Sequence, residues 1–233
     1  YKNIILIMLS SLSYIVSLCN TETGDHISTL KGHTDGFACV SFSPDGKYVC
    51  SGSRDKTVRL WNTKTGIIKR TLKGHTGTVY GVSFSRDGKY ICSGSGDETV
   101  RVWDTETGII KSTLERHTIC VFKVFNVSFS PDGNYICSGS EDKTVKLWNT
   151  ETGIIERTLK GHTSAVFSVS FSHKGEYICS GSHDKTVRLW NTDTGEIIRT
   201  LNGHTDTVTS VSFSPYGKII CSGSWDKTVR LWK

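Results

Sequence analysis

Short stretches of alternating apolar and polar residues follow one another along the chain, and turn-forming residues separate them. One such unit has stretches at residues 37–42, 48–50, 57–61 and 67–72, and residues 57–61 (Thr-Val-Arg-Leu-Trp) alternate most regularly. Alternation with a period of two predicts half-buried β-strands. The Ser-Pro-Asp-Gly sequence at residues 43–46 predicts a tight turn, since proline presets the second position and glycine suits the fourth. The unit is therefore expected to form four short antiparallel strands, and no stretch shows a convincing helical periodicity.

The same unit recurs along the chain. Each copy runs from Gly-His through Cys-Ser-Gly-Ser and an Asp to Leu-Trp or Val-Trp, except that the third copy begins with Arg-His. Matching tryptophans are 42 residues apart, or 45 across the third copy, which has three extra residues near 119–123. A fixed period in this range indicates a repeat architecture in one domain. The copies span residues 32–73, 74–115, 116–160, 161–202 and 203–233, with tryptophans at Trp61, Trp103, Trp148, Trp190 and Trp232.

Residues 1–23 precede the first complete copy and allow two interpretations. Residues 4–19 are strongly apolar and follow Lys2, as in a targeting segment, but they are short for a membrane-spanning helix, which needs about 20 apolar residues. Residues 18–24 (Leu-Cys-Asn-Thr-Glu-Thr-Gly) match residues 147–153 (Leu-Trp-Asn-Thr-Glu-Thr-Gly) with cysteine in place of tryptophan. We therefore favour a degenerate partial repeat, and no membrane partner is expected unless residues 4–19 are a targeting segment.

The charge of the chain changes this picture little. The formal net charge is +6, from 28 basic and 22 acidic residues, and a mildly basic chain can favour an acidic partner. Most basic residues, however, recur at equivalent positions of the copies, such as Lys56, Lys143, Lys185 and Lys227. Such positions predict a solvated face, so nucleic acid is not the expected partner.

Cysteine usage bears on the cellular compartment. Equivalent positions of successive copies lie a whole repeat apart, whereas a disulfide needs Cα atoms within roughly 7 Å. Cysteines at such positions are expected to be unpaired, small, buried apolar residues. Free thiols suit a reducing compartment, so an intracellular location in the cytoplasm or nucleus is predicted. Five of the eight cysteines share one place in the repeat: Cys50, Cys92, Cys137, Cys179 and Cys221.

Gly-His, four predicted strands and Trp-Asn or Trp-Asp together resemble the WD-repeat (WD40) family over residues 24–233. The resemblance is specific, because five copies agree. It implies an all-β fold, the WD40-type β-propeller, in which four-stranded antiparallel blades surround a central channel. About five blades are expected here.

The sequence leaves open whether the ring of blades closes. The fifth copy ends after its third strand, and residues 24–30 match the outer strand of other copies, as in 195–201. We expect residues 24–31 to complete the fifth blade and close the ring. An incomplete ring is a nearly equal alternative, because propellers of this family most often have seven blades and residues 1–23 resemble the remnant of another repeat.

The family resemblance also implies a structural role for four residues of each copy. In WD40 blades a His, a Ser or Thr, an Asp and the Trp form a hydrogen-bonded tetrad. This is chemically reasonable, because a half-buried carboxylate needs partners and an imidazole between a carboxylate and a hydroxyl is satisfied at both nitrogens. By motif position the tetrads are His33, Ser51, Asp55 and Trp61; His75, Ser93, Asp97 and Trp103; His117, Ser138, Asp142 and Trp148; His162, Ser180, Asp184 and Trp190; His204, Ser222, Asp226 and Trp232.

Ser, His and Asp also form the catalytic triads of hydrolases. A triad is needed once, beside an oxyanion hole, whereas this set recurs five times in one register. No enzyme activity is therefore predicted. The Gly-Ser-Gly sequence at residues 94–96 lacks a phosphate-binding pattern, and no Cys/His cluster has the spacing of zinc ligands, so neither a cofactor nor a metal is expected.

Binding is expected where the copies differ, on loops at one mouth of the channel. In this family the residue before the tetrad Asp faces the top surface, and a second top-face position follows the first apolar residue of the inner strand. The first position holds Arg54, Gly96, Glu141, His183 and Trp225, and the second holds Ala38, Tyr80, Phe125, Phe167 and Thr209. The predicted partner-binding residues are Arg54, Tyr80, Phe125, Glu141, Phe167, His183 and Trp225.

The resemblance predicts a non-catalytic scaffold that binds other proteins or peptides on this top face. Aromatic faces and a carboxylate can together hold a cationic side chain, so a peptide containing Arg or Lys is the expected ligand. One alternative is that the top-face residues share no pocket. Another is a regulatory or sensor repeat array belonging to a larger signalling protein, such as a nucleotide-switch ATPase.

Overall fold

The computed structural model describes residues 4–8, 15–20, 22–115 and 122–233. These residues form 22 strands and no helix, so the all-β fold predicted from the alternating pattern is confirmed. Within the same ranges, no helical segment has the length and hydropathy to span a bilayer.

The described strands form six antiparallel sheets, one for each repeat and one ahead of the first repeat. In every sheet the spatial order of the strands is their order in the chain, so each strand pairs with its neighbour in sequence. The sheets consist of β1 (Ile4–Met8), β2 (Ile15–Asn20) and β3 (His26–Lys31); β4 (Phe37–Phe42), β5 (Tyr48–Ser53), β6 (Val58–Asn62) and β7 (Ile68–Leu72); β8 (Val79–Phe84), β9 (Tyr90–Ser95), β10 (Val100–Asp104) and β11 (Ile110–Leu114); β12 (Val124–Phe129), β13 (Tyr135–Ser140), β14 (Val145–Asn149) and β15 (Ile155–Leu159); β16 (Val166–Phe171), β17 (Tyr177–Ser182), β18 (Val187–Asn191) and β19 (Ile197–Leu201); β20 (Val208–Phe213), β21 (Ile220–Ser224) and β22 (Val229–Trp232).

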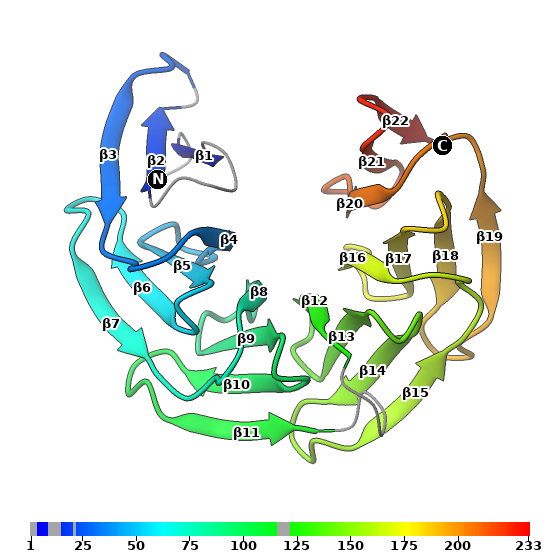
Figure 1. Cartoon of the computed structure of the whole chain (residues 1–233), viewed down its shortest axis with the longest axis horizontal. Helices are drawn as coiled ribbons and strands as arrows, with labels where there is room; N and C mark the ends of the chain where they lie inside the picture. Colours follow the sequence, from blue (N-terminus) through cyan, green and yellow to red (C-terminus); the bar gives the residue numbers. More distant parts are fainter. Residues whose placement is uncertain (1–3, 9–14, 21, 116–121) are drawn as a thin grey trace.

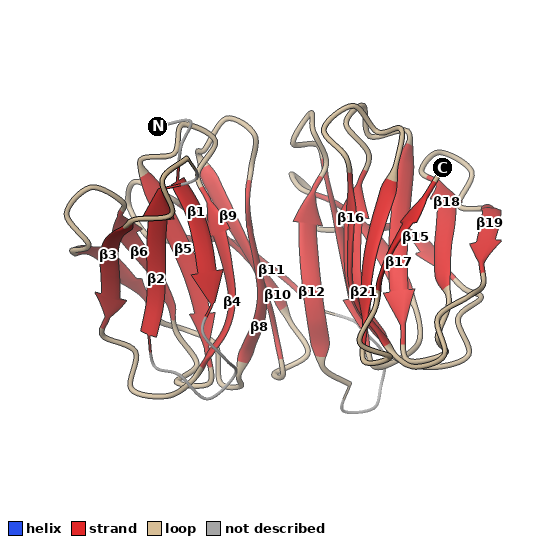
Figure 2. Ribbon diagram, turned by 90° about the horizontal axis from the view of Figure 1, so that it is seen from above, coloured by secondary structure: helices blue, strands red, loops and turns tan. Residues whose placement is uncertain are grey.

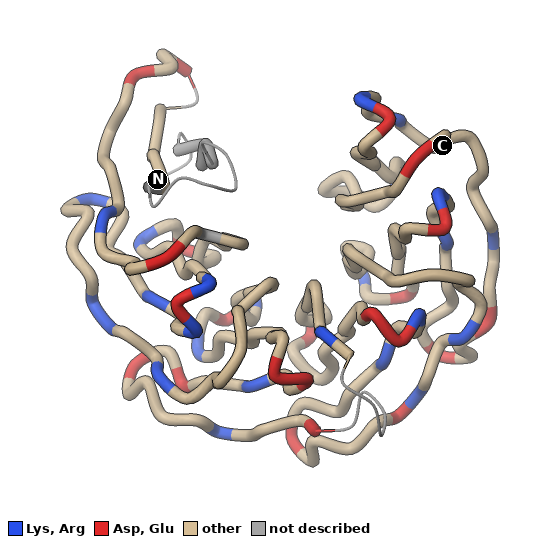
Figure 3. The backbone as a smooth tube through the Cα atoms, in the orientation of Figure 1, with Lys and Arg blue, Asp and Glu red and all other residues tan. Residues whose placement is uncertain are grey.

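The sheets are arranged as the blades of an open arc (Figure 1). The first strand of each repeat (β4, β8, β12, β16 and β20) lines the concave side, and β7, β11, β15 and β19 lie on the convex side. In the perpendicular view the strands run between two ends of the molecule, where the loops gather (Figure 2). Basic and acidic residues are interspersed along the arc and do not collect in one basic stripe (Figure 3).

The hydrophobic core lies between neighbouring sheets. Cys50, Leu60 and Leu72 of the first repeat, for example, pack in one cluster with Phe84 and Trp103 of the second. Four of the repeat cysteines are fully buried at these contacts, as the sequence predicts, whereas the fifth, in β21, is only partly buried. The sheet that contains β21 is the last in the arc, so no following sheet covers it.

The prediction that residues 24–31 complete the fifth blade is wrong. β3, which these residues form, pairs with β2 in the first sheet, and the ring is not closed. The turn between β2 and β3 is fixed by hydrogen bonds from Asn20 N to Asp25 O and from Gly24 N to Asn20 O, the pattern found between β6 and β7. Pairing across a short turn loses less chain entropy than pairing with the far end of the chain.

Packing also explains why this first sheet stays with the first repeat. Val16, Leu18 and Leu30 are completely buried and cluster with Val49 and Trp61 of the next sheet. Burial of three such side chains contributes roughly 1.5–3 kcal/mol each. The five repeats therefore form five sheets as predicted, the N-terminal segment adds a sixth, and the arc corresponds to the incomplete-ring alternative.

Candidate functional site

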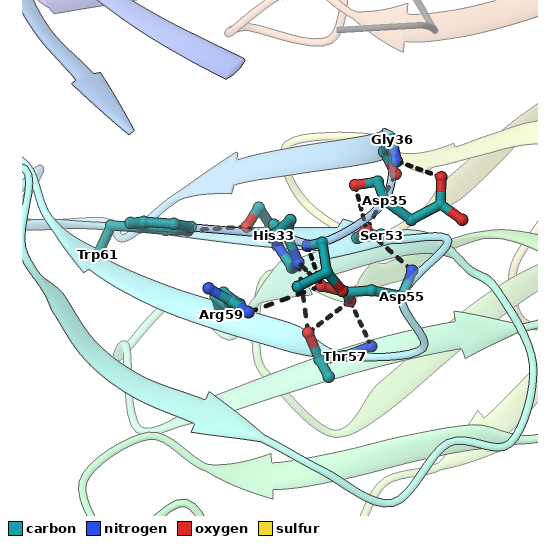
Figure 4. A network of polar contacts seen from close by, with 10 residues as sticks. His33, Asp35, Gly36, Ser53, Asp55, Thr57, Arg59 and Trp61 are labelled. Carbon is teal, nitrogen blue, oxygen red and sulfur yellow. Dashed lines mark hydrogen bonds and ion pairs between the residues drawn. The ribbon is translucent and has the colours of Figure 1, made fainter. Parts of the chain in front are cut away.

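The predicted tetrad of the first repeat is a continuous hydrogen-bonded chain (Figure 4). The indole Nε1–H of Trp61 donates to Ser51 Oγ at 2.7 Å. The same Oγ lies 2.8 Å from His33 Nε2, and His33 Nδ1 lies 2.7 Å from Asp55 Oδ2. Because the indole can only donate and a carboxylate can only accept, the hydroxyl donates to Nε2 and Nδ1–H donates to Asp55. These hydrogen-bond directions require a neutral His33 with its proton on Nδ1.

The carboxylate of Asp55 has further donors. The Thr57 hydroxyl donates to Oδ1 at 2.6 Å, the backbone N–H of Thr34 donates to Oδ2 at 3.1 Å, and the Arg59 guanidinium lies 3.7 Å from Oδ2. Burial alone would raise the pKa of Asp55, but the hydrogen bonds from Thr57, His33 and Thr34 outweigh it and hold the pKa below the usual 3.8. Burial lowers the pKa of His33 below 6.5 even though Asp55 acts in the opposite direction. The pair is thus an ionised carboxylate and a neutral imidazole near pH 7.

The second, fourth and fifth repeats have the same geometry. The His Nδ1 to Asp Oδ2 distances are 2.8, 2.7 and 2.7 Å, and the Trp Nε1 to Ser Oγ distance is 2.8 Å in each. In the third repeat Trp148 donates to Ser138 at 2.8 Å and Thr144 donates to Asp142 at 2.6 Å, while His117 lies outside the described residues. In the second, fourth and fifth repeats the complete tetrads are His75, Ser93, Asp97 and Trp103; His162, Ser180, Asp184 and Trp190; His204, Ser222, Asp226 and Trp232.

The tetrads are unsuited to catalysis for a geometric reason. Their serine side chains are completely buried, and each hydroxyl already accepts a hydrogen bond from a tryptophan. A nucleophile needs access to a substrate carbonyl and a nearby oxyanion site. The quartets therefore fix the second and third strands of a blade, and the turn between them, to the loop that carries the histidine.

Two family models match the chain, one on each half. A model of the WD domain, G-beta repeat, matches residues 24–62 and 66–104, and a model of the IFT122 first beta-propeller matches residues 123–233. The chain belongs to the WD40-repeat family. The resemblance found in the sequence is thereby confirmed, and WD40 propellers generally act as protein-interaction scaffolds that are typically non-catalytic.

Individual relatives match over shorter stretches. The Notchless protein homolog of Arabidopsis thaliana is 61% identical over 31 residues, which are 13% of this chain and 7% of that protein. WD repeat-containing protein SL1-17 of Schistosoma mansoni is 41% identical over 49 residues, which are 21% of this chain and 16% of that protein. The matched stretches are thus a small part of either relative.

Most of the predicted top-face residues come together in the structure. Phe125 and Phe167 have ring centroids 4.7 Å apart, and Tyr80 lies 5.5 Å from Phe125. Phe167 lies 6.3 Å from both His183 and Trp225, whose rings meet edge to face at 6.5 Å. We call these five residues of four consecutive repeats the aromatic row. Trp225 is 60% exposed, so the row presents aromatic surface to solvent.

A β-bulge in each inner strand positions the second residue of that strand. In β8, Val79 pairs with Ser95 and Gly81 with Gly94, so Tyr80 is an extra residue without an opposite partner. The inner strands of the other four repeats shift register at the same place. A bulge turns its side chain away from the regular alternation. Sequence reasoning missed the bulge. A regular strand would bury every second residue, but the buried residues Val79, Val82 and Phe84 are three and then two positions apart, which indicates one extra residue.

One backbone hydrogen bond in each repeat brings the two top-face positions to the same end of the sheet. The residue before the tetrad Asp donates its backbone N–H to the carbonyl of the residue that comes two positions before the bulge residue in the chain. Examples are the bonds from Trp225 to Thr207 and from His183 to Ala165, both 2.9 Å long. Glu141 follows this pattern with Lys123, and its Oε2 also accepts from Lys123 N at 3.3 Å. Arg54 is exposed in the first repeat, where the bulge residue is alanine, and no cation–π contact of Arg54 is found among the described residues.

Proposed function

We propose that this chain is a non-catalytic interaction module that binds proteins or peptides through the aromatic row. The supporting observation is that the residues which vary among otherwise similar repeats also stack on one another across four repeats. Tryptophan and tyrosine are frequent anchors of protein interfaces, because their large rigid rings lose little side-chain entropy on binding. A partly exposed row of such rings fits this role.

The negative charge of Glu141, near Phe125 of the aromatic row, favours a cationic ligand. From the described residues, the Glu141 carboxylate accepts one hydrogen bond, a long one of 3.3 Å, so it keeps acceptor capacity beside the strand that carries Phe125. Aromatic faces attract a guanidinium or ammonium group within about 6 Å of the ring centroid. The ligand that we propose is therefore an extended peptide containing Arg or Lys, with its cationic side chain bound by the aromatic rings and Glu141.

We also propose that the protein is located inside the cell. The described cysteines are free, and four of them are fully buried. Such thiols persist in a reducing compartment, which supports the cytoplasm or nucleus. Fractionation of cells that express the chain checks this point, and recovery from the secreted fraction would contradict it.

The binding test compares labelled peptides that differ only in their charged residue. Peptides with Arg or Lys in a Gly/Ser context are titrated against the chain by fluorescence polarisation, beside matched peptides with Gln. We expect the cationic peptides to bind more tightly, and the double variant F167A/W225A to lose that preference. The control is Y216A, which removes an 84% exposed aromatic side chain that does not belong to the aromatic row. Equal binding of Arg, Lys and Gln peptides, or unchanged binding by F167A/W225A, would contradict the proposal.

A further inference from the structure

The turns that follow the inner strands also differ among the repeats. These turns have the same backbone, because a glycine N–H donates to a serine carbonyl at 2.8–2.9 Å in all five repeats. The second position of the turn is proline in the first, third and fifth repeats, but Arg86 in the second and His173 in the fourth. The aromatic row lies near the start of the inner strands, and these turns follow their ends. About four residues of an inner strand, with a rise of about 3.3 Å each, separate the aromatic row from these turns by roughly 13 Å.

Arg86 and His173 both line a hollow of about 310 Å³, together with Pro131 of the third repeat. The final phenylalanine of three successive inner strands also lines the hollow. Each of these phenylalanine residues is 7% exposed, so only a small part of each reaches the surface. The apolar lining consists of Phe84, Phe129 and Phe171.

The guanidinium of Arg86 has no partner among the described residues. It makes neither a hydrogen bond nor an ion pair with them, and the residue is exposed. Its neighbour Asp87 is engaged elsewhere, since Asp87 accepts hydrogen bonds from Ser85 Oγ at 2.7 Å and from Lys89 N at 3.0 Å. No acidic residue lines this hollow. The hollow therefore combines an unpaired cation with an apolar lining.

We propose that this hollow is a second binding site, which takes an acidic peptide segment. A carboxylate of the peptide binds the guanidinium of Arg86, whose planar fork matches carboxylate geometry. An adjacent apolar side chain of the peptide contacts Phe84, Phe129 and Phe171. A volume of about 310 Å³ lies at the low end of ligand pockets, which suits one or two side chains of a peptide. The site does not depend on the aromatic row, so the chain can hold two ligands of opposite charge at the two ends of its inner strands.

Variants for the test come from the other repeats of the chain. R86P and H173P introduce the residue that the same turn carries at Pro44, Pro131 and Pro215, so the turn and the fold are preserved. The probe is an immobilised array of octapeptides in which Asp or Glu flanks one Leu or Phe, beside matched arrays with Asn or Gln and with phosphoserine. Circular dichroism of each variant confirms that it is folded before binding is measured.

We expect the acidic peptides to bind in preference to the amide peptides, with an affinity that falls as salt rises. R86P should raise the Kd of the best acidic peptide by at least about tenfold, as expected for loss of a charge-assisted hydrogen bond, and H173P by less. F167A/W225A should leave this binding unchanged. The proposal is overturned by equal binding of acidic and amide peptides, by unchanged binding to R86P, or by loss of binding in F167A/W225A. Stronger binding of phosphoserine than of Asp and Glu would overturn the assignment to a carboxylate.

Discussion

A Cβ atom on Gly74 would lie 2.5 Å from Nη1 of Arg101, closer than real Cβ contacts allow. Gly74 precedes the tetrad histidine of its repeat, and Arg101 is the second residue of β10. The third repeat departs from the pattern at both positions, with Arg116 for the glycine and Lys146 for the arginine. An alanine at position 74 would therefore have to displace the end of the Arg101 side chain.

This relationship predicts a rescue between two substitutions. G74A should lower the free energy of unfolding by about 1–3 kcal/mol, because the added methyl group overpacks the site. The double variant G74A/R101K should recover most of the loss, since lysine has no Nη1 atom at that place. Urea denaturation followed by tryptophan fluorescence measures both. The control is G223A, where a Cβ would meet no atom within 4 Å. A double variant no more stable than G74A would contradict this explanation.

The tetrad serine is predicted to be a major source of stability. In S93A the indole N–H of Trp103 and Nε2 of His75 would both lose their buried hydrogen-bond partner. Leaving two buried polar groups unsatisfied costs about 2–4 kcal/mol, which thermal or urea denaturation would detect. The matched control is S83A, in a half-buried position where the hydroxyl makes only a 3.4 Å contact with a carbonyl. Equal stability of the two variants would disprove the role of the quartet.

Acid is predicted to destabilise the protein in two steps. Burial lowers the pKa of His33 and His162 below 6.5, so below pH 6.5 the unfolded chain binds protons that the folded chain resists, and stability falls as pH falls. The second step involves the tetrad aspartates. Burial would raise the pKa of Asp97 and Asp184, but hydrogen bonds from His75, His162 and nearby threonines hold it below 3.8. Their contribution is present above pH 3.8 and is lost below it.

Melting temperatures between pH 8 and pH 3 measure both steps. We expect little change from pH 8 to pH 7, a decline below about pH 6.5 and a steeper decline below pH 4. A melting temperature that stays constant from pH 7.5 to pH 5 would show that the histidines of the folded protein are not resisting protonation.

The buried cysteines are predicted to react slowly with thiol reagents. Burial raises the pKa of Cys92 and Cys179, and it raises the pKa of Cys39 to about 12. Few thiolates, the reactive species, are then available at pH 8. After brief treatment with N-ethylmaleimide, peptide mass spectrometry should find Cys221, which is partly exposed, modified before Cys92 and Cys179. Equal rates at these three residues would contradict the burial of the repeat cysteines.

The repeat period and the blade-forming sheets could be predicted from the sequence because the same residues recur in register. His33, Ser51, Asp55 and Trp61 have counterparts at the same spacings in the other copies, apart from the three extra residues of the third copy, so one copy explains the others. The open ring could not be predicted in this way. Residues 24–31 fit the outer position of either the first or the last sheet, and the choice depends on a turn at Asn20 and on the burial of β2, which the alternating pattern does not reveal.

The candidate site was only partly predictable. The family resemblance predicted that Phe125, Phe167 and Trp225 lie on the top face, and the structure brings their rings together. The same reasoning grouped Arg54 with them, but the aromatic row does not reach the first repeat. The hollow beside Arg86 was missed because it depends on three turns that come together only when neighbouring sheets pack.

The bulge in the inner strand has a consequence for how such a chain changes over evolutionary time. Tyr80 and its counterparts in the other repeats have no opposite residue in the ladder. A substitution at one of these positions therefore leaves the paired residues of the two strands unchanged. Mutations at these places can alter which molecules are recognised while the architecture persists, and a duplicated repeat can acquire a new specificity by a single codon change.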